Sequence, residues 1–321
     1  MAASIRQPEQ MLSGRVPMSA RLEAIVELAE RGDILCDVGC DHAHVPIRLL
    51  QSGCYRRAIG MDVIAGPLGK AAGNLSLYGM EDLVELRLSN GLDAFSVGEA
   101  DTLVITGMGG TLMEDILLRQ PEKTASFSAL VLGPQSDPEK VRAALRRLGF
   151  LIKKEKLIFE DGKYYPVIRA ESGENPDARE FNTLPATSNE TILGEVLSNE
   201  ALSKELLSDE AVSGEALSKE ALSKETLSKE TGGGIQDLRL QAQDMFGPVL
   251  LENRDPVLLE FLTRRTAVLE RILCSIRQAA RDTCKDPVLV QRHLARQCEI
   301  EHDLAVFKAA LTVYDKGTDS K

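Results

Sequence analysis

The chain has 321 residues, of which 43% are hydrophobic, and a formal net charge of −11 at pH 7. That apolar content is enough for one well-cored domain with an appendage, and it excludes a chain that is disordered throughout. The acidity is uneven, because residues 173–232 have a net charge of −8, whereas residues 1–172 have −3 and residues 233–321 have zero. The total charge therefore does not exclude a nucleic-acid partner for the two flanking regions.

The six cysteines are scattered without a Cys-x-x-Cys pair, which is typical of reduced thiols rather than of a disulfide framework. The N-terminal segment MAASIRQPEQMLSGRVP has no apolar core of signal-peptide length. No window approaches the ~18 uncharged apolar residues that a membrane-spanning helix needs. We therefore expect a soluble, cytoplasmic protein that does not enter a membrane.

From residue 19 to residue 171, helical patterns alternate with short apolar runs that are typical of strands. Such βαβ repetition predicts a parallel, doubly wound α/β sheet. The end differs, because two extended runs are joined by Glu160-Asp161-Gly162-Lys163, and an Asp-Gly centre between such runs predicts an antiparallel hairpin. The common methyltransferase fold ends in this way, an analogy at the level of the fold alone. The expected helices cover residues 19–31, 44–50, 66–78 and 111–118 and a segment that starts at Asp137-Pro138.

A repeat of five residues begins at Ser188, with units such as SNEAL, SKELL and SKEAL, and ends at Gly232-Gly233-Gly234. A period of five advances about 500° on a helix and forms no apolar stripe. We therefore expect a low-complexity spacer that is partly helical or disordered.

Two long helices are expected after the spacer, because Asp255-Pro256 and Asp286-Pro287 each offer an N-cap followed by proline at the first helical position. Apolar residues keep a three-four spacing on each helix, and a short connection makes the pair an antiparallel hairpin about 40 Å long. A packing or dimerising coiled coil explains this pair at least as well as substrate binding does. The spaced residues are Leu262, Leu269, Leu273, Ile276 and Ala280 on the first helix and Leu294, Leu304, Phe307, Leu311 and Tyr314 on the second.

The chain thus divides into three predicted regions. Residues 1–172 form the sheet domain, residues 173–234 the spacer, and residues 235–321 the helical domain.

Candidate site residues follow the first two strands, at the edge where an open parallel sheet binds ligands. The first strand runs into Asp37-x-Gly39, which places a carboxylate and a bare backbone at this edge, although the same loop also fits an ordinary strand-to-helix turn. Asp62 closes the second strand, where an acid can bind the two hydroxyls of a ribose or cap the next helix.

Two further loops end at the same edge. Asn90-Gly91 follows the third strand and can contact an adenine edge or form a plain turn. Gly107-Met108-Gly109-Gly110 follows the fourth, and three glycines in four positions favour close approach of a ligand to the backbone.

The first loop also holds Asp41, His42 and His44 beside Cys40. Their spacing matches no closed zinc pattern, so we expect no metal. Because a helix N-terminus disfavours positive charge, the two imidazoles are expected to be neutral at pH 7. They can hydrogen-bond to a base or a cofactor, and capping and packing are equally good explanations.

Seven basic residues stand against one acidic residue, Glu155, between residues 140 and 156. Such a run usually forms a solvated face. In a chain short of positive charge it is also the best candidate for phosphate contacts with a nucleic acid. The candidates are Lys140, Arg142, Arg146, Arg147, Lys153 and Lys154, with Lys156 as the seventh residue.

Seven motifs follow one another along the chain: RLEAIVELA, DVGCDHAHVP, GMDVIAGPLGKAAGN, NGL, TGMGG, LGPQSD and FEDGKYYPVI. In this order, they resemble the motifs of the bacterial tRNA (adenine-22-N1)-methyltransferase family. The resemblance spans about residues 19 to 171 and resumes near Met245-Phe246-Gly247-Pro248. It implies a class I enzyme that depends on S-adenosyl-L-methionine, with a Rossmann-like sheet and a C-terminal coiled coil that helps to hold tRNA.

Carried over by position, the resemblance assigns a role to each loop. Asp37, Gly39 and Asp41 would frame the methionine part of the cofactor. Asp62 would bind its ribose, Asn90 and Gly91 its adenine, and Gly107 to Gly110 would floor the acceptor pocket. His42, His44 and Tyr164 are the candidates for catalytic contacts with the target base.

The sequence departs from the family pattern at three places. Asp62 stands where many members have glutamate, and Gly133-Pro134-Gln135-Ser136 stands where others read Gln-Pro-Asn. The five-residue repeat has no counterpart in the family pattern.

The expected chemistry agrees with the resemblance. Enzymes that methylate exocyclic amines commonly present an Asn/Asp-Pro-Pro-Tyr loop, and this chain has GMGG at that place. The N1 atom of adenine holds an in-plane lone pair, so it needs alignment with the methyl group more than it needs a base. The target base would have to be extruded from the tRNA.

Other classes of protein remain open at this point. A methyltransferase of the same fold could act on a protein or a small molecule. A nicotinamide-dependent dehydrogenase is disfavoured, because Gly-x-Gly-x-x-Gly is missing and the sheet closes on a hairpin. A non-enzymatic scaffold could act through the helical hairpin. The oligomeric state is open, with a monomer as our working expectation.

Overall fold

The computed structural model describes residues 14–173, 232–282 and 287–315. Its contacts divide the chain into two compact units, the first of which contains the described residues up to 173 together with Gly247–Leu250. The second contains the described residues 232–246 and those from Leu251 onwards. From residue 174 to residue 231, the predicted spacer lies outside the described residues.

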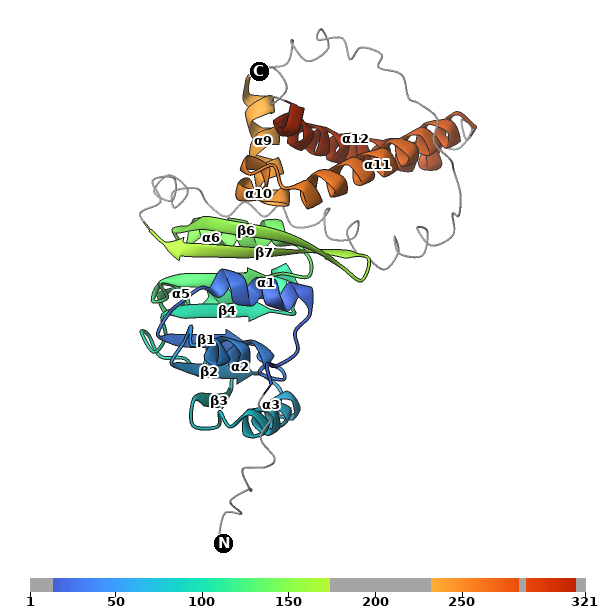
Figure 1. Ribbon diagram of the computed structural model, residues 1–321. Coiled ribbons are helices and arrows are strands. Elements are labelled where there is room, and N and C mark those ends of the chain that lie inside the picture. Colours follow the sequence, from blue (N-terminus) through green and yellow to red (C-terminus); the bar gives the residue numbers. More distant parts are fainter. Residues whose placement is uncertain (1–13, 174–231, 283–286, 316–321) are drawn as a thin grey trace. The chain divides into compact units, whose positions relative to one another are not determined.

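The first unit contains a seven-stranded sheet with the order β3-β2-β1-β4-β5-β7-β6 (Figure 1). Strands β1 to β5 are parallel, and β7 pairs antiparallel with both β5 and β6. This confirms the predicted methyltransferase-type sheet that ends in an antiparallel hairpin. The strands are β1 (Ile34–Val38), β2 (Arg57–Asp62), β3 (Val84–Leu88), β4 (Thr102–Thr106), β5 (Ala129–Gly133), β6 (Phe150–Glu160) and β7 (Lys163–Ser172).

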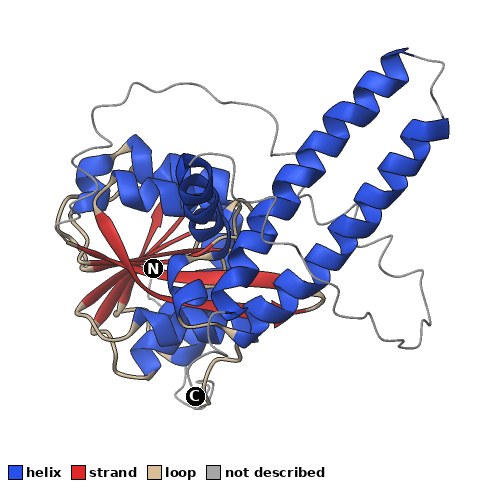
Figure 2. Ribbon diagram, turned by 90° about the horizontal axis from the view of Figure 1, so that it is seen from above, coloured by secondary structure: helices blue, strands red, loops and turns tan. Residues whose placement is uncertain are grey.

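Helices cover both faces of the sheet, as Figure 2 shows. Buried residues of α1, α2 and α3 share one core cluster, and those of α4 and α6 share the cluster on the opposite face. Strand residues alternate between the clusters, so that Leu103 and Ile105 of β4 point to one face and Val104 to the other. The helices are α1 (Ala20–Ala29), α2 (His44–Gln51), α3 (Ala65–Tyr78), α4 (Gly110–Arg119), α5 (Pro121–Ala125) and α6 (Pro138–Arg147).

The order in which strands are added to the sheet reverses between β1 and β4. These two parallel strands are neighbours in space and are followed by helices on opposite faces. A switch point of this kind leaves a crevice at the carboxyl ends of the strands. The loops after β1, β2, β3, β4 and β5 therefore meet at one edge of the sheet.

The β6–β7 hairpin closes with Asp161 at φ 50° and Gly162 at φ 75°. Positive φ at both central residues belongs to a type I′ turn, and it closes the hairpin that the Asp-Gly pair predicted. Because Leu132 of β5 pairs with Ile168, the part of β7 before Ile168 extends past the carboxyl end of β5. The tip of the hairpin thus lies on the same side of the sheet as the candidate site.

A buried ion pair lies on the α6 face of this hairpin. The guanidinium Nε of Arg142 donates to Glu155 Oε1 at 2.8 Å, and both side chains are almost completely buried. The second carboxylate oxygen of Glu155 accepts from the backbone N–H of Val249 at 2.9 Å. Gly247 has φ 97°, and a Cβ there would lie 2.5 Å from Glu155 Oε2, so glycine fits where a side chain would not.

The second unit consists of α9 (Gly232–Phe246), the end of α10 (Pro248–Glu252), α11 (Pro256–Asp282) and α12 (Pro287–Asp315). Asp255 Oδ1 accepts from the N–H of Leu258 at 2.9 Å, which confirms the predicted N-cap of α11. Ion pairs join Arg277 to Glu301 and Glu270 to Lys308, so α11 and α12 run antiparallel as predicted.

The apolar spacing of the helical pair is only partly right. Leu262, Leu269 and Leu273 are buried on α11, and Leu304 and Phe307 are buried on α12. Leu294 was expected to pack in the same row, but its side chain is 53% exposed. Within the described residues, no helix is long and apolar enough to cross a membrane.

Candidate functional site

Asp37 is the most unusual side chain at the carboxyl edge of the sheet. Its residue is only 2% exposed, and its Oδ1 atom has no hydrogen-bond partner in the part of the chain that the structure describes. Burial, with a smaller effect from the nearby carboxylate of Asp62, raises the pKa of Asp37 to about 7. A buried carboxylate without a partner is costly, so this atom is placed to receive a donor from a ligand.

The loop after β1 brings its backbone close to β4. Gly39 has φ 77°, and a Cβ there would lie 2.8 Å from Met108 Cε. Asp41 and Ala43 are also in the left-handed region, with φ 45° and 58°. Non-glycine residues adopt this region at a cost, and such strain gathers at ligand sites.

Asp62 at the end of β2 is held by the backbone. Its Oδ1 accepts from the N–H of Ile64 at 3.0 Å, and its Oδ2 accepts from the N–H of Asp41 at 3.3 Å. The helix that follows begins at Ala65 with Ile64 as its N-cap, so Asp62 shapes the turn rather than capping the helix. The carboxylate keeps lone pairs for a further partner.

A pocket of about 450 Å³ lies between the loops after β2 and β3. Two of its walls are apolar side chains that are largely exposed, Val63 at 61% and Leu88 at 63%. Exposed apolar side chains that line a hollow favour a flat, apolar ligand group. The other lining residues are Ser89, Asn90, Asp93 and Ala94.

Of this lining, our sequence interpretation found Asn90 and missed the two apolar walls. Val63 directly follows the acid of the second strand, and Leu88 is two residues before Asn90. A large apolar residue beside a predicted ligand contact at the end of a strand was the available signal.

His42 and His44 lie together at the start of α2, with ring centroids 5.6 Å apart. Burial, and secondarily the other imidazole, lowers the pKa of His44, which agrees with the neutral form expected from the sequence. His42 Nε2 lies 3.6 Å from Asp41 Oδ1, and Asn74 of α3 donates to the His42 carbonyl at 2.9 Å. Burial raises the pKa of Cys40, so the thiol in this loop stays protonated.

The glycines after β4 have different tasks. A Cβ at Gly110 would lie 2.2 Å from the carbonyl oxygen of Asp137, so this glycine lets α4 pack against the loop after β5. A Cβ at Gly109 would meet Ser136 Oγ at 2.9 Å. Gly107 has φ 82°, and nothing lies within 4 Å of the position of its Cβ. Of the three glycines, Gly107 alone borders open space.

Tyr164 lies on the β6–β7 hairpin opposite Phe159, with ring centroids 4.7 Å apart. Phe159 is 50% exposed. The structure thus places Tyr164 on the correct side of the sheet, but on a different element from the two histidines. In the described part of the chain, the ring contact of Tyr164 is with Phe159, and that of His42 is with His44.

The predicted phosphate contacts need a correction at Arg142. Its residue is 1% exposed and it is paired with Glu155, so it cannot reach a phosphate. Lys154 pairs with Glu30, and Arg147 lies 3.9 Å from Glu114. Lys140 donates to Thr111 Oγ1 at 2.9 Å. Glu155 was counted within this run, but Glu30 and Glu114 come from other segments of the chain, so the local count of charges missed them.

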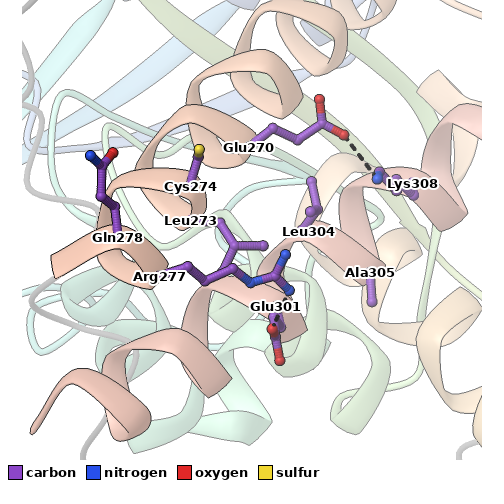
Figure 3. A pocket seen from close by; sticks show the side chains of 9 residues that line it. All are labelled: Glu270, Leu273, Cys274, Arg277, Gln278, Glu301, Leu304, Ala305 and Lys308. Carbon is purple, nitrogen blue, oxygen red and sulfur yellow. Dashed lines mark hydrogen bonds and ion pairs between the residues drawn. The ribbon is translucent and has the colours of Figure 1, made fainter. Parts of the chain in front are cut away.

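A second pocket, of about 720 Å³, lies in the helical unit between α11 and α12 (Figure 3). Its charged lining residues are paired across it, Arg277 with Glu301 at 2.7 Å and Lys308 with Glu270 at 2.9 Å. Leu273 forms part of the wall between them. This pocket is a groove of the helix pair that ion pairs already bridge. Among the described residues, no group of three or more His, Cys, Asp or Glu is placed to hold a metal ion.

Comparison with known proteins agrees with this geometry. A family model described as a methyltransferase domain matches residues 18–168. The tRNA (adenine(22)-N(1))-methyltransferase of Bacillus subtilis is 30% identical over 169 residues, which cover 53% of this chain and 71% of that protein.

Solved structures show the same fold. A protein of the NADB-Rossmann superfamily from Streptococcus agalactiae is 25% identical with a TM-score of 0.63, covering 92% of this chain and 97% of its own. A putative tRNA (m1A22) methyltransferase from Streptococcus pneumoniae, in complex with S-adenosyl-L-methionine, is 24% identical with a TM-score of 0.58. That alignment covers 90% of this chain and 100% of the other.

The seven-stranded sheet, the methyltransferase match and the Bacillus subtilis relative define a class I methyltransferase, the class whose methyl donor is S-adenosyl-L-methionine. The carboxyl edge fits this cofactor, because it offers an unpaired buried oxygen on Asp37, a close backbone approach at Gly39 and an apolar-walled pocket. With the Bacillus subtilis relative, the match shows that the chain belongs to the family of tRNA (adenine(22)-N(1))-methyltransferases.

Proposed function

We propose that this protein transfers the methyl group of S-adenosyl-L-methionine to N1 of adenine 22 in tRNA. The observation that carries the proposal is the unpaired, buried Asp37 oxygen at the switch point of a methyltransferase sheet, in a chain whose curated relative has this activity. The tRNA substrate is drawn from the relatives. This chain's own residues support the cofactor contacts and the open space beside Gly107.

Asp37 would receive the charged amino group of the cofactor's methionine part. An ammonium close to the carboxylate lowers the pKa of Asp37 and restores its ionised form at neutral pH. The resulting charge-assisted hydrogen bond also satisfies the atom that is otherwise without a partner. Gly39 and Asp41 frame the same part of the cofactor from the loop after β1.

Asp62 would accept from the two ribose hydroxyls with the lone pairs that Ile64 and Asp41 leave free. The pocket between Val63 and Leu88 would take the adenine ring, with Asn90 and Gly91 at its edge. In this arrangement the adenine stacks between apolar walls while its polar edge meets the loop after β3. Gly107, which follows β4, would leave space for an acceptor beside the bound cofactor.

The bound cofactor supplies an electrophilic methyl group, which forms a bond to adenine N1 while its bond to sulfur breaks and the electron pair stays on sulfur. N1 already presents a lone pair, so no proton has to leave before the transfer. What this chain contributes is alignment and exclusion of water. His42, His44 and Tyr164 are proposed to contact the extruded base, with the neutral His44 able to donate or accept one hydrogen bond.

Lys140, Arg146, Arg147, Lys153 and Lys154 remain candidates for contacts with tRNA phosphates, and Arg142 is withdrawn. The helical pair of the second unit is proposed to help hold the tRNA. Such contacts would make binding weaken with rising salt. The proposed site of action is the cytoplasm, where tRNA is modified.

The test is incubation of the full chain with S-adenosyl-L-methionine, labelled on its methyl group, and unmodified tRNA transcripts. The expected product is one 1-methyladenosine per tRNA, at position 22 after nuclease digestion and mass analysis. A transcript with guanosine at position 22 is the matched control and should accept no label. Label on a protein or a small molecule, with tRNA inert, would show a different acceptor for the same fold.

A further inference from the structure

The loop after β3, residues Ser89 to Ala94, forms one side of the 450 Å³ pocket. Part of it is held from within, because Ser89 Oγ donates to the Gly91 carbonyl at 2.8 Å and accepts from the N–H of Ala94 at 3.0 Å. Asn90 is one of the residues that line the pocket, and Gly91, at φ 59°, turns the chain directly after it.

Three side chains from the junction of α4 and α5 hold this loop from behind. Arg119 Nη2 donates to the Asn90 carbonyl at 2.8 Å. Gln120 Nε2 donates to Asp93 Oδ1 at 2.6 Å. Lys123 Nζ donates to the carbonyls of Leu92 at 2.9 Å and Asp93 at 3.1 Å.

The fit between Arg119 and the turn is close. A Cβ at Gly91 would lie 3.0 Å from Arg119 Nη2 and 3.1 Å from Ile116 Cγ1. Arg119 is also 3.7 Å from the carboxylate of Asp93 and 3.6 Å from that of Asp115. Two neighbouring acids thus orient the guanidinium towards the Asn90 carbonyl.

We infer that Arg119, supported by Gln120 and Lys123, is a positioning residue that sets the shape of the adenine pocket and so its selectivity for adenine. It acts through Asn90 and does not itself line the pocket. Because the Asn90 carbonyl is fixed, the side-chain amide and the neighbouring backbone keep one arrangement towards the base. The inference rests on the placement of the cofactor's adenine proposed above.

The experiment measures binding of S-adenosyl-L-homocysteine to the full chain by calorimetry, and compares it with the analogue in which hypoxanthine replaces adenine. Arg119→Met removes the donors and keeps most of the stem. We expect about a tenfold weaker affinity for S-adenosyl-L-homocysteine, from the loss of one charge-assisted hydrogen bond. The preference of the wild-type chain for adenine over hypoxanthine should shrink by a similar factor.

Two variants serve as matched comparisons. Arg119→Lys keeps a cationic donor and should recover part of the preference for adenine. Arg56→Met removes an arginine that pairs with Asp33 at the amino ends of β1 and β2, and should bind both ligands as the wild type does. If Arg119→Met does not fold, Lys123→Met tests the support of the same loop, because it removes the hydrogen bonds to the carbonyls of Leu92 and Asp93.

Three results would overturn the inference. The first is an unchanged affinity of Arg119→Met, and the second is an equal loss for both ligands, which would mean general loosening of the fold. The third is a tight wild-type complex that shows no preference for adenine. None of these measurements requires tRNA, so failure of the proposed tRNA substrate would leave the inference standing. If the wild-type chain binds neither ligand, the cofactor placement fails, and this inference fails with it.

Discussion

The two halves of the carboxyl edge use charge in opposite ways. In the half formed by the loops after β1, β2 and β3, acids converge, and one of them, Asp37, is buried with an oxygen that has no partner among the described residues. In the half beyond β4, the basic side chains that we can follow are largely matched by acids, as Arg142 is by Glu155. Unsatisfied polar atoms, rather than the number of charges, are therefore the better indication of a ligand site.

Glycine shows the same contrast. Gly39 and Gly91 bring backbone close to neighbouring side chains around the proposed cofactor, while Gly110 lets two segments of the half beyond β4 pack together. Gly107 is the exception in that half, since it borders open space.

The largest expected effect is on stability, and it comes from removing the buried ion pair between Arg142 and Glu155. Arg142→Met leaves the Glu155 carboxylate buried without its partner, so the free energy of unfolding should fall by about 3–5 kcal/mol in urea titrations. Lys154→Met, which removes an exposed partner of Glu30, is the control and should change stability little. A stable Arg142→Met variant that had lost affinity for tRNA would restore the phosphate role that we withdrew.

The second prediction concerns Asp37, whose buried Oδ1 atom has no hydrogen-bond partner among the described residues. Because the pKa of Asp37 is raised in the folded chain, the folded state binds more protons than the unfolded state between about pH 4 and 7, and stability falls as pH rises through that window. Asp37→Asn should abolish this fall and gain on the order of 2–4 kcal/mol at pH 8 without cofactor.

The same variant should lose function while it gains stability. Affinity for S-adenosyl-L-methionine should fall about 10- to 100-fold, as expected for loss of a charge-assisted hydrogen bond. In the wild-type chain, affinity should weaken as pH drops below 7, because protonation removes the charge on Asp37. An Asp37→Asn variant that binds the cofactor normally would contradict the site.

The third prediction separates the two kinds of glycine in the GMGG loop. Gly110→Ala forces a Cβ against the Asp137 carbonyl and should cost about 3 kcal/mol of stability, because the atoms that it meets belong to the backbone. Gly107→Ala meets no atom and should cost about 1–2 kcal/mol through its positive φ alone, while narrowing the space for the acceptor. The melting temperature should therefore fall more in Gly110→Ala, whereas the KM for tRNA should rise more in Gly107→Ala. Equal responses would mean that both glycines serve packing.

The smallest expected effect lies at the rim of the proposed adenine pocket. Leu88→Ala removes an apolar wall that is mostly exposed, so stability should be nearly unchanged. Affinity for S-adenosyl-L-homocysteine should fall about threefold, as the ligand buries less apolar surface. Val97→Ala, at another exposed valine outside the pocket, is the control. A loss as large as that of Asp37→Asn would mean that this apolar wall, rather than the Asp37 carboxylate, supplies the main binding energy.

Much of the fold followed from local signals in the sequence. The alternation of strands and helices, the Asp-Gly turn and the Asp-Pro starts of α6 and α11 each depend on a few neighbouring residues, and each appears in the structure. The candidate cofactor loops were found for the same reason, since each directly follows its strand. What failed depends on contacts between distant segments. Glu155, 13 residues from Arg142, buries a side chain that looked like a phosphate ligand.

Other parts of the site were invisible for the same physical reason. The hydrogen bonds that hold the loop after β3 join residues 27 to 31 positions apart, and the sequence of neither segment indicates the other. The burial of Asp37, which raises its pKa, comes from packing on both faces of the sheet. Leu294 kept the helical period and still lies in solvent, because a period does not fix which turns of a helix find a partner.

The central claim is that the acids of the first three loops hold S-adenosyl-L-methionine for transfer to one adenine of tRNA. The most direct test compares nuclease-digest mass maps of tRNA from cells with the intact gene, without it, and with an Asp37→Asn copy. We expect 1-methyladenosine at position 22 only with the intact gene. Full modification in cells that lack the gene, or in cells with the Asp37→Asn copy, would contradict it.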